Sequence, residues 1–177
     1  MMKSLGETMK LVTTHLVLEP FEHAHFDGLR SMESDPEIMR YISNGIVKSP
    51  EETRANIERV MLRWQQYGFS WWAMREKESH EVVGAACLQH LANQDGAPLE
   101  IGWRLHANHH GKGYATEAGR AIIQFAAEKI GAKYLVAVAD PKNTASQKVM
   151  QRLGMKYKAI EEHYDVPCVV YELQIAE

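Results

Sequence analysis

The segment 98–139 constrains the fold more than any other part of the chain. Its first stretch, "PLEIGWRL", predicts a strand, and a helix is expected after Gly113 because apolar residues such as Ile122 and Phe125 recur on one face. Gly131 marks the end of that helix. The apolar run "KYLVAVA" that follows is typical of a strand buried on both faces. A strand, a crossover helix and a second buried strand together predict a right-handed parallel unit.

The other strands are predicted to pair antiparallel. "SWWAMRE" and "EVVGAACLQHL" flank the polar turn "KESH", which is typical of a hairpin, and "PLEIGWRL" follows as a third strand of the same kind. "THLVLEPF" predicts a first strand that Pro20 closes, and "MKYKAIEEHY" and "VPCVVYELQI" predict two closing strands. The expected class is therefore α/β, with a mixed, mostly antiparallel sheet that is parallel in its middle.

Further helices are predicted before and after this sheet core. The clearest runs from Ser49 to Tyr67, where Ser49 is the N-cap, Pro50 stands in the first turn and Glu52 completes a capping box. We also expect helices over 22–33, over "SDPEIMRYI" and after Pro141.

The 177 residues have the length of one domain and contain no linker or repeat that would divide them. We expect a domain over 9–177 and a short flexible lead over 1–8. The net charge of -3 argues against direct nucleic-acid binding and against an anionic membrane surface, because such surfaces usually come from a basic excess. Monomer and homodimer are both compatible with the sequence.

The cysteines and the N-terminus predict a cytoplasmic location. Cys87 and Cys168 lie in apolar runs without a CxxC motif, which favours buried free thiols in a reducing cytosol. The start "MMKSLGETMK" lacks the apolar core of a signal peptide, and no segment approaches the ~18 apolar residues of a spanning helix.

The turn "HHGKGYAT" joins a strand directly to a helix and is suited to anion binding. Unpaired amides at a helix N-terminus bind phosphate, and Gly111 and Gly113 allow a ligand to approach the main chain. The turn is neither of the common nucleotide motifs. Thr116 stands where the dinucleotide fingerprint needs a third glycine, and Gly113 follows Lys112 where the P-loop needs Ser or Thr.

Three motifs in order, "EIGW", "GKGYATEA" and "NTASQKVMQRLGM", resemble the GNAT superfamily of acyl-CoA N-acyltransferases. The pattern is similar to its RimJ/RimL-like branch, which acetylates ribosomal-protein N-termini, and the likeness covers nearly the whole chain. It implies a single-domain GNAT fold with a splayed pair of parallel strands, here 100–105 and 133–139. Pantetheine would lie between them in the manner of an added strand.

The resemblance also implies where acetyl-CoA binds as the acyl donor. The loop pattern of the family, Gln or Arg, two residues, Gly, one residue, then Gly or Ala, maps onto His110, Gly113 and Ala115, with His110 as a departure. Backbone bonds to pantetheine would come from Trp103 and Leu105. The residues implied at the pyrophosphate are His110, Gly111, Lys112, Gly113, Tyr114, Ala115 and Thr116, and those near the thioester are Asn143 and Ser146.

Acetyl transfer by direct attack needs a base for the amine and a proton for the leaving thiolate. Glu100 is the preferred base, although a solvated glutamate at a strand edge is the competing interpretation; His106 and His109 are rivals. Met150 fills the position where many members of the family have a tyrosine that acts as the general acid. Ser146 is therefore the candidate acid and Tyr157 an outside one. Cys87, in an apolar strand, argues against a covalent thiol intermediate.

A metal site at the histidines is not expected. A zinc site needs converging ligands, whereas the adjacent side chains of His109 and His110 should point apart, with His106 and His90 as the other possible members.

The amine acceptor is left open by the sequence: a ribosomal or other protein N-terminus and a small-molecule amine both fit. Fold analogy places Tyr41, Ile46 and several tryptophans around its pocket. Two other functions stay open. One is a CoA-binding module without catalysis, motivated by Met150. The other is a dinucleotide-binding domain, disfavoured by Thr116.

Overall fold

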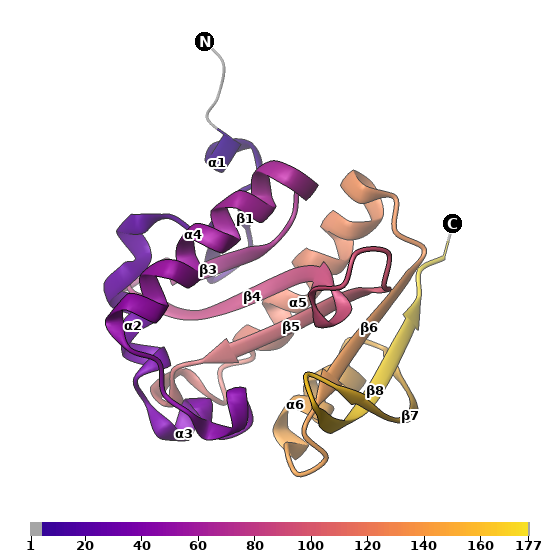
Figure 1. Ribbon diagram of the computed structural model, residues 1–177. Helices are drawn as coiled ribbons and strands as arrows, with labels where there is room; N and C mark the ends of the chain where they lie inside the picture. Colours follow the sequence, from indigo (N-terminus) through magenta and orange to yellow (C-terminus); the bar gives the residue numbers. More distant parts are fainter. Residues whose placement is uncertain (1–4, 177) are drawn as a thin grey trace.

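The computed structural model describes residues 5–176 and contains one eight-stranded sheet in the order β1-β2-β3-β4-β5-β6-β8-β7 (Figure 1). The strands are β1 Leu11–Val12, β2 Leu16–Pro20, β3 Trp71–Glu76, β4 Val82–His90, β5 Leu99–Leu105, β6 Tyr134–Ala139, β7 Lys156–His163 and β8 Val166–Gln174. Every neighbouring pair is antiparallel except β5 and β6. The predicted mixed sheet and its single parallel unit are confirmed.

The strands β5 and β6 separate soon after they begin. They pair only at Leu99 with Leu135 and at Glu100 with Val136, whereas the β4–β5 pairing continues to Leu105. Figure 1 shows the two strands diverging from this point. Beyond Glu100 the edge of β5 that faces β6 therefore has main-chain groups without a strand partner, and buried groups of this kind need one.

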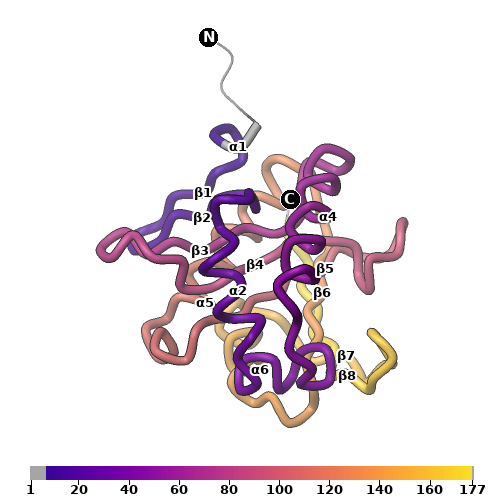
Figure 2. The backbone as a smooth tube through the Cα atoms, turned by 60° about the vertical axis from the view of Figure 1, so that its left-hand side comes forward, coloured from indigo at the N-terminus to yellow at the C-terminus, as the bar shows by residue number. Residues whose placement is uncertain are grey.

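Helices cover both faces of the sheet. They are α1 Leu5–Thr8, α2 Phe26–Glu33, α3 Pro36–Met39, α4 Pro50–Tyr67, α5 Tyr114–Phe125 and α6 Thr144–Arg152. In Figure 1 α2 and α4 lie in front of the strands and α5 lies behind β4 and β5, and the turned view of Figure 2 brings α2 and α4 forward. The helix α4 begins with the predicted capping box of Ser49 and Glu52 and ends at Gly68 in the left-handed conformation.

Aromatic and aliphatic side chains between these layers form the main core. Trp72 is fully buried and packs edge-on against Trp64 of α4 and Phe125 of α5, with ring centroids 4.8 and 5.3 Å apart. Edge-to-face pairs of this kind add to the stabilisation that burial of the rings provides.

Some predicted elements differ in detail. The expected helix over 22–33 starts as a 3-10 turn at His23–His25. Of the N-terminal lead expected over 1–8, the second half forms α1, and residues 1–4 lie outside the described part. The prediction that "KYLVAVA" is buried on both faces is wrong at its end. Val138 and Ala139 are only half-buried, because they line the cleft described below. Among the described residues no helix is both long and apolar enough to cross a membrane.

Candidate functional site

A cleft of about 530 Å³ opens where β5 and β6 separate. This volume lies in the range of small-molecule sites. Its floor comes from β3, β4 and β5, one wall from the segment between α3 and α4 together with α4, and the other wall from the end of β6, from α6 and from the β7–β8 turn. Glu100, Trp103 and Ser146 line it, as do Tyr41 and Trp71, whereas Ile46 does not.

Glu100 lies on the floor of the cleft and is only 6% exposed, so the interpretation as a solvated strand-edge residue is wrong. Burial raises the pKa of its carboxyl group to about 7, although hydrogen bonds from Tyr164 and Gln89 oppose the shift. A carboxyl group with this pKa is well matched to a proton-transfer role near neutral pH.

The two donors to Glu100 belong to a hydrogen-bonded chain whose direction is fixed. The indole of Trp71 can only donate, and its Nε1 lies 3.0 Å from Gln89 Oε1. The Gln89 amide group therefore turns Nε2 toward Tyr164 Oη at 2.9 Å and Glu100 Oε2 at 3.3 Å. Since the Ala92 amide also donates to Tyr164 Oη at 3.2 Å, the single proton of that hydroxyl goes to Glu100 Oε2. The hydrogen bonds from Gln89 and Tyr164 both reach Glu100 Oε2, so Oε1 remains available to take a proton from a substrate.

Tyr164 is the functional candidate that sequence reasoning missed. It occupies the two-residue turn between β7 and β8 with Asp165, and both have positive φ, 54° and 62°. Such turns usually contain Asn, Asp or Gly, because bulky residues are strained in this region. A tyrosine in so tight a hairpin was the one available signal.

The predicted residues of α6 flank the cleft from the other side. Asn143 caps the helix by accepting the Ser146 amide at 3.1 Å, and Ser146 lines the cleft beside Met150. Tyr157 is 56% exposed and is not one of the residues that line the cleft. Cys87 does line it, but burial raises the pKa of its thiol well above the usual value, so the nucleophilic thiolate is disfavoured.

The predicted glycine turn presents free backbone amides. Gly111 and Gly113 have φ of 77° and 79°, and Gly113 is the N-cap of α5. The first helical bond is donated by the Glu117 amide to the Gly113 carbonyl at 3.0 Å, so the amides of 114–116 have no partner within the helix. Thr116 Oγ1 is also buried without a hydrogen bond. These donors fit a pyrophosphate, which supplies several acceptor oxygens.

The side chains of the turn point elsewhere. Lys112 Nζ lies 3.3 Å from Glu76 Oε1, and the Tyr114 hydroxyl donates to the same oxygen. Since both side chains are bound to Glu76, the contacts with a pyrophosphate that are predicted for these residues would have to come from their main-chain amides. His110 is among the residues implied at the pyrophosphate, but its amide is not a free donor, because it donates to the Ala107 carbonyl at 3.2 Å.

The histidines diverge, as their spacing predicts. His106 Nε2 lies 3.0 Å from Ser31 Oγ, His110 Nε2 lies 3.2 Å from the Leu105 carbonyl, and His109 Nδ1 lies 3.7 Å from a Glu76 oxygen. Within residues 5–176 no three His, Cys, Asp or Glu side chains converge as metal ligands. Neither rival base, His106 or His109, lines the cleft.

A second buried carboxylate, Glu33 of α2, connects the helices to the sheet. It is fully buried, and its oxygens accept from Arg104 at 3.0 Å, Lys48 at 3.1 Å and Thr53 at 2.7 Å. Burial alone would raise the pKa of Glu33, but these partners outweigh it and the pKa is lowered. The cluster has two cations for one anion, and Arg104 Nε is buried without a partner.

Replacing Glu33 by alanine should lower the free energy of unfolding by about 3–5 kcal/mol, because it leaves Arg104 buried and uncompensated. Urea unfolding at neutral pH measures the change. Glu51→Ala is the matched control: Glu51 makes an exposed ion pair with Arg54 at 4.0 Å, and its removal should change stability little. Equal effects of the two substitutions would contradict a structural role for the Glu33 cluster.

Known proteins resemble the chain over most of its length. Residues 15–156 match the family described as "Acetyltransferase (GNAT) domain". The protein YkkB of Bacillus subtilis is 32% identical over 168 residues, which cover 92% of this chain and 94% of YkkB.

Solved structures share the fold. A GNAT-family acetyltransferase of Bacillus anthracis superposes with a TM-score of 0.80 at 23% identity, over 93% of this chain and 98% of the other. The ribosomal L7/L12 alpha-N-protein acetyltransferase RimL, solved in complex with coenzyme A, gives 0.78 at 18% identity, over 94% and 98%. At these identities the likeness concerns the fold.

Proposed function

The chain belongs to the GNAT family of acetyltransferases, and on this basis we propose that it transfers an acetyl group from acetyl-CoA to a primary amine by direct attack. The observation that carries the proposal is Glu100. It is a buried carboxyl group with a pKa of about 7, and it lines the cleft where β5 loses its partner strand.

Two regions of the protein would bind different parts of acetyl-CoA. The amides of the glycine turn and the hydroxyl of Thr116 would bind the pyrophosphate. The free edge of β5, with Trp103 and Leu105, would bind the pantetheine amides as a neighbouring strand does. The thioester would then lie near the start of β5, in the cleft that Glu100 and Ser146 line.

Glu100 would act as the general base. The lone pair of a neutral amine forms the new C–N bond at the thioester carbonyl carbon, and Glu100 Oε1 takes the proton that the nitrogen releases. The C–S bond then breaks, and the thiolate takes a proton from Ser146 or from water. Ser146 is the proposed acid because Met150, at the usual tyrosine position, has no proton to give.

The acceptor is proposed to be a protein N-terminus or a small-molecule amine. RimL acts on a ribosomal protein, and an α-amino group is easier to deprotonate at pH 7 than a lysine. Both cysteines are free and buried, which fits a reducing compartment and is the basis for proposing a cytoplasmic location. Monomer and homodimer remain equally compatible with the fold.

Acetyl-CoA should raise the thermal midpoint of the protein, and a panel of amines and N-terminal peptides should release free CoA. Binding at 100 times Kd stabilises a protein by about 2.7 kcal/mol, which a melting curve detects readily. Stabilisation without CoA release on any amine would instead identify a CoA-binding module. Stabilisation by NAD but not by acetyl-CoA would identify a dinucleotide-binding domain.

A further inference from the structure

The charged side chains that line the cleft are sorted by wall. The wall formed by α4 and by the segment between α3 and α4 contributes Arg40, Lys48 and Arg63 and no carboxylate, and we call it the basic wall. The opposite wall, formed by the end of β6 and the β7–β8 turn, contributes Asp140 and Asp165 and no cation, and we call it the acidic wall. In Figure 1 α3 lies at the lower left and the β7–β8 hairpin at the lower right. A cleft with opposite charges on its two walls favours a ligand whose own charges are separated in the same way.

The basic wall carries more positive charge than its carboxylate partners balance. Arg63 is half-buried, yet within the described part of the chain it makes no hydrogen bond and no ion pair. Arg40 is exposed, and its guanidinium lies 5.3 Å from the centre of the Tyr41 ring. Lys48 and Arg104 share the single charge of Glu33. A partly buried cation such as Arg63 is normally paired, so an anion beside Arg63 would complete this wall.

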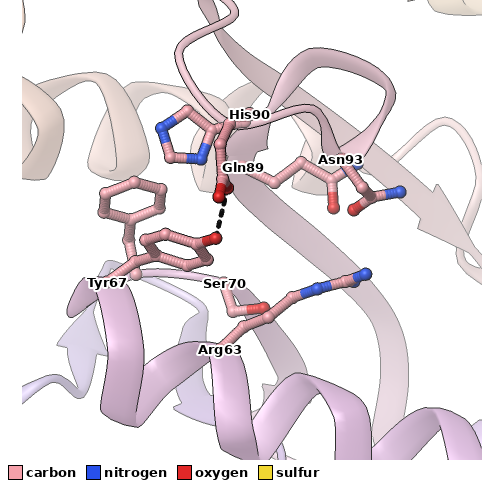
Figure 3. Close-up of a pocket in the computed structure, with 8 residues that line it drawn as sticks. Arg63, Tyr67, Ser70, Gln89, His90 and Asn93 are labelled. Atoms are coloured by element: carbon pink, nitrogen blue, oxygen red, sulfur yellow. Dashed lines mark hydrogen bonds between the residues drawn. The ribbon is translucent and has the colours of Figure 1, made fainter.

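Arg63 extends into a recess that adjoins the base. The recess has a volume of about 20 Å³, enough for about one water molecule, and Arg63, Gln89 and Asn93 line both it and the cleft. Figure 3 shows Arg63 reaching from α4 past Ser70 toward the side where Gln89 and Asn93 lie. Ser70 Oγ is buried there without a partner.

One carboxylate, Asp95, also lines the recess, but it accepts the hydroxyl proton of Tyr67 and forms no ion pair with Arg63. An anionic group at the mouth of the recess would therefore meet an unpaired guanidinium. The Ser70 hydroxyl and the Asn93 side-chain amide, which also line the recess, make no hydrogen bond to any residue that the structure describes.

We propose that the acceptor is an amine that also bears an anionic group. Its amine lies toward Glu100 and the acidic wall, and its anion is bound by Arg63 and the basic wall. This inference rests on the proposed acetyl transfer and narrows its substrate class. The phosphates of CoA do not account for the basic wall, because residues 110–116, which would bind them, do not line this cleft.

Three amines of equal chain length test the charge of the acceptor: δ-aminovalerate, its neutral amide and the diamine cadaverine. With saturating acetyl-CoA, kcat/KM should be about 10- to 100-fold higher for the carboxylate than for the amide, and lowest for the diamine. Phosphoethanolamine against ethanolamine separates phosphate from carboxylate recognition. Peptides that differ only by Asp or Asn at the second position extend the test to protein N-termini.

Arg63→Gln should reduce the preference for carboxylate over amide by about 10-fold, through the KM of the acceptor rather than that of acetyl-CoA. Lys129→Gln, on an exposed part of the opposite layer, is the control and should retain the full preference. Equal use of the three amines would overturn the inference while leaving acetyl transfer intact. A change in the acetyl-CoA KM alone would assign the basic wall to the donor and would also overturn it. If no amine at all were acetylated, the proposed function itself would fail.

Discussion

Replacing Glu100 by glutamine should lower kcat/KM for the amine by about 100-fold or more near neutral pH, while the KM for acetyl-CoA changes little. Glutamine keeps the shape of the side chain and can accept the hydrogen bonds from Tyr164 and Gln89, but it cannot take a proton. Steady-state CoA release with saturating acetyl-CoA measures the loss.

The pH profile identifies the group that was removed. The pKa of Glu100 is raised to about 7, and only its carboxylate form is a base, so the wild-type rate should rise with pH through this value. The inflection should be absent in Glu100→Gln. Tyr164→Phe removes a donor that favours the carboxylate, so its inflection should move to higher pH. Tyr157→Phe, an exposed tyrosine outside the cleft, should leave the inflection in place.

The stability of Glu100→Gln separates catalysis from folding. Because the pKa in the folded state is raised above the ordinary 4.5, Glu100 favours folding at low pH and this contribution is lost as pH rises toward about 7. The glutamine variant has no such loss, so at pH 8 its thermal midpoint should equal or exceed that of the wild type. An inactive variant that also melts lower, or a fully active one, would remove Glu100 from the proposed role.

Gly113→Val should abolish measurable acetyl-CoA binding, with Kd rising by more than about 100-fold. The residue has φ of 79°, where a side chain costs roughly 1–2 kcal/mol. No protein atom lies within 4 Å of a Cβ placed there, so the new side chain would project into open space at the N-cap of α5, where we propose that the pyrophosphate binds. Titration calorimetry with acetyl-CoA measures the change.

Gly131→Val is the matched control for this substitution. Gly131 has φ of 72° and an equally open surrounding, but it ends the segment that follows α5 and is remote from the turn in sequence. It should cost similar stability and leave acetyl-CoA binding intact. His110→Ala should also bind normally. A loss of binding in His110→Ala with retention in Gly113→Val would assign the site to the histidines instead.

Most of the scaffold could be predicted from the sequence, because the residues that determine its helices and turns act on the backbone close to them. The capping residues at Ser49 and Glu52, the turn "KESH" and the glycines around Lys112 each determine backbone geometry within a few residues. The parallel unit also followed from chain order, since a strand, a helix and a buried strand allow one handedness. Glu100 could be placed on its strand, but whether it was solvated could not be determined.

The remaining features depend on contacts between distant segments. Tyr164 reaches Glu100 across 64 positions, and Glu33 meets Arg104 across 71. No periodicity or motif in one chain records such pairs. The separation of charge between the two walls of the cleft could not be predicted for the same reason, because Arg63 and Asp165 line one cleft only after the sheet has formed.

The position of Tyr164 has a consequence for shortened forms of the protein. The family match ends at residue 156, yet the hydroxyl bound to Glu100 belongs to the hairpin that follows. The second strand of this hairpin, β8, also pairs with β6 from Tyr134 with Gln174 to Ala139 with Val169. A truncation at the end of the family match would therefore remove both the donor to Glu100 and the main partner of β6, so it should damage the fold as well as proton transfer.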